Sequence, residues 1–379
     1  MERRIRYGMV GGGPGAFIGA AHRKAIALDE RADLTAGCFS SNMEKNLQCG
    51  KQYGLAESRI YEDYKKMAEE EGKREDKIDF VCVVTPNSTH YVICKAFLEA
   101  GINVFCEKPL CFTIEEAEEL ERLAKEKNLL FGICYTYSGY AMVKLAKELV
   151  ENGEIGEVVN VNAEYLQDWL IDEVGNNDSS TVKLSVWRTD PAKSGRSNCV
   201  GDIGSHIENT VAYITGLKIK KVSAVLDRYG HELDLNANML VEYDNGAHGV
   251  YNCSQVCAGH YNGLIVRIYG SKGAIEWVQE EPDVLKFIPK GEPIRIYNRG
   301  TGHVTGRGAQ VSHLPSGHPE GLVFAICNHY TAFIDTLIAK ENGQEYKGDY
   351  PSVEAGVSGV KFINKVVDSD QDGTVWKEI

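Results

Sequence analysis

A lysine stands directly in front of a proline at the end of a strand-forming apolar run, in the segment VFCEKPL at residues 104–110. Proline restricts the backbone of the residue before it, so we predict that Lys108 is held in one direction. The carboxyl end of a parallel strand is where open α/β sheets bind ligands. Lys108 is therefore a candidate hydrogen-bond donor to a reacting oxygen. A surface ion pair between Glu107 and Lys108 is the alternative interpretation.

A carboxylate and an imidazole follow in the segment GDIGSH at residues 201–206. Asp202 and His206 are four residues apart, so they share one face if a helix begins here. Histidine titrates near neutrality and can accept an alcohol proton, while a nearby carboxylate can orient it. A capping aspartate and a packed core histidine are the alternative.

Glycines at residues 11–15 separate a predicted first strand from a predicted helix at residues 20–28. Gly11, Gly13 and Ala16 fit the spacing G-x-G-x-x-[G/A], and Phe17 and Ile18 follow them. Glycines at these positions allow a tight turn and close approach to a pyrophosphate, whose charge a helix N-terminus favours. A purely structural turn is the alternative, but the strand–loop–helix context favours a dinucleotide site.

The end of the second predicted strand leaves the choice of dinucleotide open. An acid at this place usually holds the ribose of NAD, but the chain has Ser40 and Ser41 there. Both hydroxyls can bind either ribose form, and Lys45 could meet a 2′-phosphate. NAD is favoured, and NADP stays possible.

The first third of the chain alternates continuous apolar runs with helical segments, which indicates a parallel sheet covered on both faces. Residues 1–134 are therefore predicted to form a doubly wound domain. Within it, Thr113 is the expected N-cap of a helix, with Glu116 in the capping-box position.

Residues 135–379 change to longer, alternating strand patterns, and we predict an α/β domain with a large, mainly antiparallel open sheet. The turns at residues 244–246 and 270–273 are hairpin signals. Residues 280–317 are rich in glycine, proline and polar residues and are expected to form a long loop, followed by a helix over residues 319–339.

Composition excludes several classes of function. Hydrophobic residues make up 43% and charged residues 25%, and the net charge of −13 disfavours nucleic acids and anionic membranes as partners. No apolar run is expected to span a bilayer, and no signal peptide is evident, so a cytoplasmic location is expected. The 11 cysteines form no C-x-x-C pair and are expected to be reduced and mostly buried. We expect no metal; His303, His313 and His318 lack carboxylates at ligand spacing.

The segments VGGGPGAF, TPNSTHY, CEKP and GDIGSHIEN, in this order, resemble the glucose-fructose oxidoreductase and inositol dehydrogenase family (Gfo/Idh/MocA). The resemblance implies an N-terminal Rossmann domain and a C-terminal α/β domain whose open sheet often forms an oligomer interface, hence a homo-oligomer, dimer or tetramer. It implies that Lys108, Asp202 and His206 are catalytic. The cofactor-binding residues implied are Gly11, Gly13, Ala16, Phe17, Ile18, Ser40, Ser41, Lys45, Thr85, Pro86, Asn87, His90, Glu107 and Lys108, with Pro86, Asn87 and His90 beside the nicotinamide.

The words AFIGAAHR, WRTDP and GHPEG are similar to a sugar-oxidising branch that includes levoglucosan dehydrogenase and glycoside 3-dehydrogenases. That likeness implies NAD(P)-dependent oxidation of a ring hydroxyl of a sugar or glycoside, at carbon 3. Residues 194–200, SGRSNCV, depart from the inositol-type pattern. Besides Lys108, Asp202 and His206, the expected substrate contacts are Tyr135, Tyr137, Gln167, Trp187, Arg188 and His318. The alternatives are an NAD-dependent glycoside hydrolase or lyase, an inositol dehydrogenase, and a sensor without activity.

Overall fold

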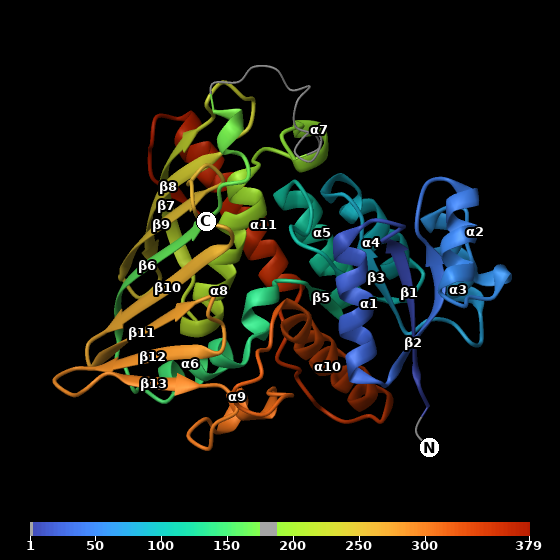
Figure 1. Cartoon of the computed structure of the whole chain (residues 1–379). Coiled ribbons are helices and arrows are strands. Elements are labelled where there is room, and N and C mark those ends of the chain that lie inside the picture. The colour runs from blue at the N-terminus through green and yellow to red at the C-terminus, as the bar shows by residue number, and fades with distance from the viewer. Residues whose placement is uncertain (1–2, 175–187) are drawn as a thin grey trace. The chain divides into compact units, whose positions relative to one another are not determined.

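The computed structural model describes residues 3–174 and 188–379, and they form two compact units. The first unit consists of Met1–Cys134 and Ile326–Val357, and the second of Tyr135–Ala325 and Ser358–Ile379 (Figure 1). The sequence placed one boundary after residue 134 and contained no signal for the return of the chain at Ile326. Such a return depends on tertiary contacts between segments far apart in the sequence, which local patterns do not report.

The first unit contains a five-stranded sheet of order β2-β1-β3-β4-β5, and all four pairings are parallel. This confirms the predicted doubly wound sheet. All five residues of the central strand β3 are buried, as expected when helices cover both faces. The strands are β1 (Ile5–Gly11), β2 (Ala32–Cys38), β3 (Phe80–Val84), β4 (Asn103–Cys106) and β5 (Phe131–Ile133).

Helices alternate with these strands, and their local signals behave as expected. Thr113 and Glu116 form the predicted capping box at the start of α5. Asp63 and Asn42 cap two further helices by accepting backbone N–H groups with their side chains. The helices are α1 (Phe17–Asp29), α2 (Met43–Gln52), α3 (Tyr64–Lys73), α4 (His90–Glu99) and α5 (Ile114–Glu126).

Helix α10 (Leu322–Glu341) covers part of the parallel sheet with aromatic side chains. Tyr330 and Phe333 pack their rings against Phe80 of β3 and Phe105 of β4. In length and composition α10 could cross a membrane, contrary to the expectation that no segment is this apolar. However, 61% of its most apolar window is buried inside the protein, as is typical of a core helix.

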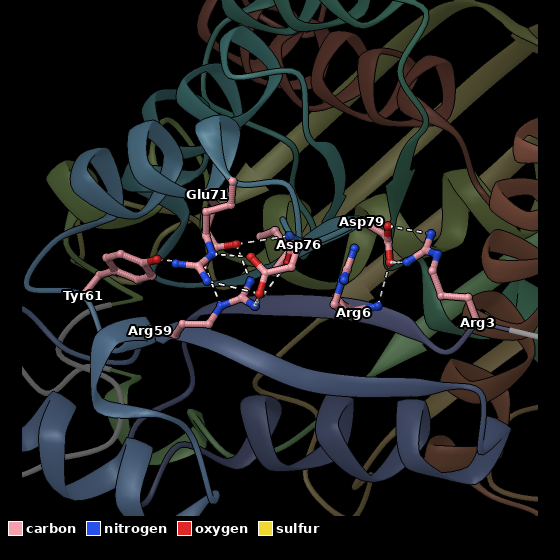
Figure 2. A network of polar contacts seen from close by, with 9 residues as sticks. Arg3, Arg6, Arg59, Tyr61, Glu71, Asp76 and Asp79 are labelled. Atoms are coloured by element: carbon pink, nitrogen blue, oxygen red, sulfur yellow. Dashed lines mark hydrogen bonds and ion pairs between the residues drawn. The ribbon is translucent and has the colours of Figure 1, made fainter.

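A buried ion pair joins the short 3-10 helix η1 (Glu57–Arg59) to α3 in the first unit (Figure 2). Arg59 donates to both carboxylate oxygens of Glu71, at 3.0 and 2.5 Å. Glu71 also accepts the hydroxyl of Tyr61 at 2.7 Å and the N–H of Ile78 at 3.1 Å. Because every partner is satisfied, the pair is tolerated in the interior, and removing one member would leave a buried charge.

The second unit contains a nine-stranded sheet of order β13-β12-β11-β10-β6-β9-β8-β7-β14. Its pairings are antiparallel except for β6 with β9, so the mainly antiparallel open sheet is confirmed. Both predicted hairpin turns join neighbouring strands, β8 to β9 and β10 to β11. The strands are β6 (Val158–Leu166), β7 (Ile219–Asp227), β8 (Asn236–Tyr243), β9 (His248–Ser254), β10 (Gly263–Gly270), β11 (Gly273–Val278), β12 (Val284–Pro289), β13 (Arg295–Asn298) and β14 (Lys377–Glu378).

One face of this sheet packs against helices, and the alternate side chains of the strands point away from them. The burial of β6 and β8 alternates along each strand, as expected for a sheet with a single core face. Figure 1 shows α6 (Ala141–Glu151), α8 (Ser205–Thr215) and the later part of α11 (Val353–Gln371) beside the sheet, and their apolar side chains share one core with it.

The expectation of a long loop over residues 280–317 is wrong. That segment contains β12, β13 and the short helix α9 (Gly306–Gln310). Leu285 and Phe287 of β12 are buried in the core of the second unit. The glycines and prolines occupy the short connections, while the strands are too brief for their alternation to outweigh the polar composition of the whole segment.

Candidate functional site

Gly12 and Gly13, in the glycine loop between β1 and α1, have no room for side chains. A Cβ on Gly19, in the first turns of α1, would lie 2.3 Å from the Cα of Gly12, so helix and loop approach more closely than any larger residue permits. A Cβ on Gly13 would lie 2.8 Å from the carbonyl oxygen of Phe39 at the end of β2. Arg23 of α1 donates a hydrogen bond to the Gly12 carbonyl at 3.0 Å, which holds the loop to the helix.

This loop fits the pyrophosphate of a dinucleotide. Helix α1 begins at Phe17 and has no acidic residue in its first turn, so its unpaired N–H groups favour an anion. Ala16 at the N-cap contributes no side-chain cap that would compete with a ligand. Gly13 leaves the backbone bare on the approach to these N–H groups.

Asn46 holds the turn after β2, where the ribose of a dinucleotide is expected. Its carboxamide accepts the N–H groups of Phe39 and Ser40, each at 2.7 Å, and donates to the Ser40 and Tyr61 carbonyls. Ser41 lies exposed on the same turn, and Lys45 lies exposed in the first turn of α2. Asn46 was not predicted; its place in the helix that follows the serines is the only signal it offers.

His90 joins the turn after β3 to the loop after β4. The ring is fully buried, with Nδ1 at 2.7 Å from the Pro109 carbonyl oxygen and Nε2 at 2.9 Å from that of Thr85. Burial lowers the pKa of His90, while the hydrogen bonds to the Pro109 and Thr85 carbonyls act in the opposite direction. Pro86 and Asn87 lie in the more accessible part of that turn. This geometry supports a positioning role for His90.

The loop that carries Lys108 is fixed by its backbone. The N–H of Glu107 donates to the Val83 carbonyl at 2.9 Å, and the N–H of Lys108 donates to Oε2 of Glu107 at 3.1 Å. The other oxygen of Glu107 lies 2.7 Å from Nε2 of His22. The Glu107 carboxylate therefore holds the backbone of its own loop. The side chain of Lys108 is partly exposed.

In the second unit, the helix expected to begin near Gly201 has a different first turn. Residues Val200–Gly204 form a π-helical turn, and α8 begins only at Ser205. Asp234, from the connection between β7 and β8, accepts the N–H groups of Asn198 and Val200, each at 2.9 Å. A carboxylate from another element thus satisfies donors that a regular helix start would leave unpaired. Single-turn π segments are frequent at functional sites.

A short chain of amides orients Asp202 within this turn. Asn198 donates to Gln255 at 2.7 Å, and Gln255 donates to Oδ2 of Asp202 at 3.0 Å. The guanidinium of Arg188 lies 3.6 Å from the same oxygen. Gln255 and Asn198 were missed from the sequence, because they lie 53 and 4 residues from Asp202 and no motif joins them.

Tyrosine rings surround the imidazole of His206. Tyr137 lies 4.7 Å from it between ring centroids, Tyr135 5.8 Å and Tyr165 6.2 Å. Only 7% of His206 is exposed. The rings leave the imidazole little rotational freedom, as a group that accepts a proton in one direction requires.

Polar side chains continue from these tyrosines in an arc centred on Asn262. Asn262 accepts from Tyr165 at 2.5 Å and from Gln167 at 3.0 Å, and Tyr137 bonds to Tyr165. Trp169 donates to Gln167 at 2.8 Å, and Arg188 lies over its indole at 5.5 Å. We call these residues the amide–tyrosine arc: Tyr137, Tyr165, Gln167, Trp169 and Asn262.

The structure thus brings together most substrate candidates of the second unit. The rings of Tyr135 and Tyr137 lie beside His206. Gln167 bonds to Asn262 in the amide–tyrosine arc, and Arg188 lies beside Asp202. His318 is exposed; its N–H donates to Pro315 and its carbonyl accepts from Arg299. Trp187 lies outside the described residues. Tyr165, Trp169 and Asn262 were missed, although the alternation along β6 places Tyr165 on the core face and so offered a signal.

Glu208 is a buried acid on the same helix as His206. Ser358 donates to its Oε1 at 2.7 Å, and among the described residues its Oε2 has no hydrogen-bond partner. Burial raises the pKa of Glu208 to about 7, and the Ser358 hydroxyl opposes the rise only in part. The folded protein therefore holds a proton here that the unfolded chain releases near its ordinary value of 4.5.

We expect this acid to make the second unit less stable as pH rises from about 4.5 to about 7. A raised pKa means that the native state binds more protons in this window, and the full loss is about 3 kcal/mol. Glu208→Gln cannot ionise, so its thermal midpoint should exceed that of the parent by several degrees more at pH 8 than at pH 5. The difference in thermal midpoint at pH 5 measures the effect of the amide itself. The same difference at pH 5 and pH 8 would contradict the raised pKa of Glu208.

Two family models match the chain. Residues 5–135 match the model described as an oxidoreductase family with an NAD-binding Rossmann fold, and residues 143–276 match the GFO/IDH/MocA C-terminal domain. The two matches fall on the parallel sheet with the glycine loop and on the unit that carries Asp202 and His206.

Similar proteins are found over most or all of the chain. An uncharacterized oxidoreductase, YfiI, of Bacillus subtilis is 36% identical over 100% of this chain and 98% of its own. A levoglucosan dehydrogenase of Pseudarthrobacter phenanthrenivorans is 27% identical over 75% and 76% of the two chains. Among solved structures, an inositol dehydrogenase homolog of Azotobacter vinelandii, complexed with NADH and myo-inositol, is 34% identical with a TM-score of 0.90 over 100% and 98%.

Proposed function

The chain belongs to the Gfo/Idh/MocA family of NAD-binding oxidoreductases, and from this premise we propose that it oxidises a ring hydroxyl of a sugar or glycoside, at carbon 3. The observation that carries the proposal is the amide–tyrosine arc beside His206. Neutral donors and acceptors next to flat aromatic faces are what a polyhydroxylated ring needs, since hydroxyls require partners and the ring faces are apolar.

NAD, when bound, supplies the acceptor for the hydride that leaves the substrate carbon. The residues proposed to hold it are the backbone of Gly11 and Gly13, the first N–H groups of α1, and the turn after β3 with Thr85, Pro86 and Asn87. Ser40, Ser41 and Lys45 contribute no acid that would repel a 2′-phosphate, which keeps NADP within the proposal.

Three side chains are proposed to act on the substrate. A neutral His206 accepts the proton of the hydroxyl at a ring nitrogen, and the tyrosines around it keep the imidazole in place. Lys108 donates a hydrogen bond to the same oxygen and stabilises the negative charge that develops there. Asp202, oriented by Gln255, binds a neighbouring hydroxyl and balances the charge of the imidazolium that forms.

A cyclitol is the second candidate substrate. The relative of known structure that carries myo-inositol is similar over its whole length, which favours a six-membered polyol ring of either kind. The levoglucosan dehydrogenase relative favours a sugar. Residues 194–200 depart from the inositol-type pattern, and we rank the sugar first for that reason.

Product analysis tests the proposal. The protein is incubated with NAD, or NADP, and a panel of glucosides, anhydrosugars and inositols, and the products are identified by NMR. A 3-keto sugar with one NADH for each product is expected. Oxidation of inositols alone supports the second candidate. A hydrolysed glycoside without net NADH points to the alternative in which the hydride returns to the substrate.

Assembly and location complete the proposal. The sheet of the second unit exposes apolar side chains, among them Val159 at 52% and Leu240 at 50%, as an oligomer interface would. We propose a homo-oligomer, dimer or tetramer, which light scattering tests. None of the 11 cysteines, all of which lie in the described residues, forms a disulfide, which supports a reducing compartment such as the cytoplasm.

A further inference from the structure

A buried polar chain lies behind the lysine loop of the first unit. His22 of α1 places Nε2 at 2.7 Å from Oε1 of Glu107 and Nδ1 at 2.6 Å from the hydroxyl of Tyr330. Tyr330 belongs to α10, and its hydroxyl lies 3.1 Å from the thiol of Cys82 in β3. His22, Tyr330 and Cys82 are 0% exposed. Four elements far apart in the sequence therefore meet at one imidazole.

Nε2 of His22 must carry a proton to donate to the Glu107 carboxylate, while the Tyr330 hydroxyl near Nδ1 can donate to the ring or accept from it. Burial favours the neutral ring, but the surrounding groups, Cys82 and Cys134 among them, raise the pKa of His22 well above its ordinary value. The rings of Phe105 and Tyr330 meet the imidazole edge to face and hold its plane. His22 and Tyr330 are fully buried, so removing either partner leaves a buried polar group without its hydrogen bond, which is costly.

Glu107 transmits this arrangement to Lys108. Its two carboxylate oxygens are both engaged, Oε1 by His22 and Oε2 by the N–H of Lys108 at 3.1 Å. A carboxylate engaged in this way is unsuited to act as the base itself. Its place in the fold sets the position of the lysine backbone instead.

Helix α1 also begins at the glycine loop, at Phe17, one and a half turns before His22. The same rigid element that offers its N-terminus to the dinucleotide therefore holds the lysine loop through Glu107. Helix α1 therefore fixes both the direction of Lys108 and the position of the glycine loop.

A metal ion is the competing explanation, because His22, Glu107 and Cys134 have ligand atoms within 4.8 Å of one another. Two ligands of one tetrahedral zinc lie roughly 3.3 Å apart, given bonds of about 2.0–2.1 Å. The 2.7 Å between His22 and Glu107 is the shorter distance of a hydrogen bond. The geometry favours a hydrogen-bonded cluster.

We infer that His22 is a positioning residue for the proposed oxidation: it fixes Glu107, and through Glu107 it aims Lys108, with Tyr330 locking the ring. The inference rests on the proposed function for its kinetic consequence only. The buried chain itself is independent of which substrate is oxidised.

The charges around Glu107 determine how the loss of His22 would alter the pH dependence of kcat. Burial acts to raise the pKa of Glu107, but the His22 hydrogen bond and the nearby positive groups hold it below its ordinary value. Without His22 the pKa of this buried carboxyl rises. The titratable groups that face Glu107 are His22, His90, Cys106, Lys108 and Cys134, and Cys82 and Tyr330 face His22 behind it.

Kinetics of the complete protein with NAD provide the first test. His22→Leu is expected to lower kcat by roughly tenfold to a hundredfold, with the KM for NAD changed by less than about threefold. The acid limb of its kcat profile should move up by about one pH unit or more, because Glu107 now protonates. His22→Gln, whose amide can reach Glu107, should lose less of kcat than His22→Leu. The kcat of Tyr330→Phe should lie between those of His22→Gln and the parent.

Tyr61→Phe is the matched control. Like Tyr330, Tyr61 is a buried phenol of the first unit that bonds to a buried polar partner, here Glu71 (Figure 2). Both substitutions remove one hydroxyl, so both should lower the thermal midpoint. Only Tyr330→Phe is expected to change kcat and its pH profile.

A second readout needs neither cofactor nor substrate. Acetylation of individual lysines is followed by mass spectrometry in the cofactor-free protein, with the 72% exposed Lys73 as internal reference. Lys108 should react at least about threefold faster in His22→Leu than in the parent, because its loop is no longer held, and the rate in His22→Gln should lie between the two. Tyr61→Phe should leave the ratio unchanged.

The outcomes separate the two proposals. Failure to oxidise any ring hydroxyl refutes the proposed function, while an accelerated acetylation of Lys108 would still support the positioning chain. Unchanged acetylation, together with a parental pH profile in the variants, overturns the role of His22. A stoichiometric metal in the purified protein, lost in His22→Gln, overturns it in favour of a metal site. If His22→Leu does not fold, His22→Gln and Tyr330→Phe carry the same test.

Discussion

Lys108→Ala and His206→Ala are each expected to lower kcat by roughly two orders of magnitude or more. Lys108 is proposed to stabilise the charge on the reacting oxygen, and His206 is proposed to remove its proton. Both contributions arise in the transition state, so kcat should fall while the Kd for NADH stays nearly unchanged. Stopped-flow measurement of NADH formation, with a fluorescence titration of NADH, checks both quantities.

Two matched substitutions control for the loss of charge and of a ring. Lys73→Ala removes an exposed lysine of the first unit, and His248→Ala an exposed histidine of the second, and both should keep parental turnover. Lys108→Met keeps the length of the side chain but not its donor. Turnover in Lys108→Met or His206→Ala within a few-fold of the parent would remove that residue from the mechanism.

Gly13→Val is expected to weaken binding of NADH by about a hundredfold or more, or ~3 kcal/mol. A Cβ at Gly13 would lie 2.8 Å from the Phe39 carbonyl, a backbone atom that cannot turn aside. The glycine loop must then shift away from the end of β2, and the larger side chain occupies the approach to the α1 N-terminus. Calorimetric titration with NADH measures the loss.

Gly302→Val is the control for this substitution. Gly302 has an ordinary φ, and a Cβ there would meet nothing within 4 Å, so a valine should be accommodated. Its affinity for NADH should equal that of the parent. Parental affinity in Gly13→Val, in a protein of unchanged thermal midpoint, would show that the glycine loop does not contact the pyrophosphate.

Local patterns were sufficient for the elements that carry the site. The strands around the glycine loop and Lys108 were predicted because a continuous apolar run indicates a strand buried on both faces. The capping box at Thr113 and both hairpin turns were confirmed for the same reason: each depends on residues within a few positions of one another. The strands β12 and β13 were lost because they are short and embedded in a polar segment.

The start of α8 illustrates where local reasoning stops. The spacing of Asp202 and His206 predicted a helix, but the first turn is a π-helical turn whose donors are satisfied by Asp234. That carboxylate comes from a connection about 30 residues further on, between two strands. The sequence contains the acid but not its pairing, because the pairing follows from how the sheet folds back.

By itself the sequence determined the alternation of strands and helices in the first unit, the groups that stand at its strand ends, and the family to which these motifs belong. Those features are local, since hydrophobic period, turn chemistry and motif spacing act over a few residues. Only the tertiary structure decided which side chains hold those groups: His22 and Tyr330 behind Glu107, Gln255 beside Asp202, and Asn262 at the centre of its arc. These partners are separated by 53–308 residues, and they meet because burial of apolar surface in each unit brings their elements together.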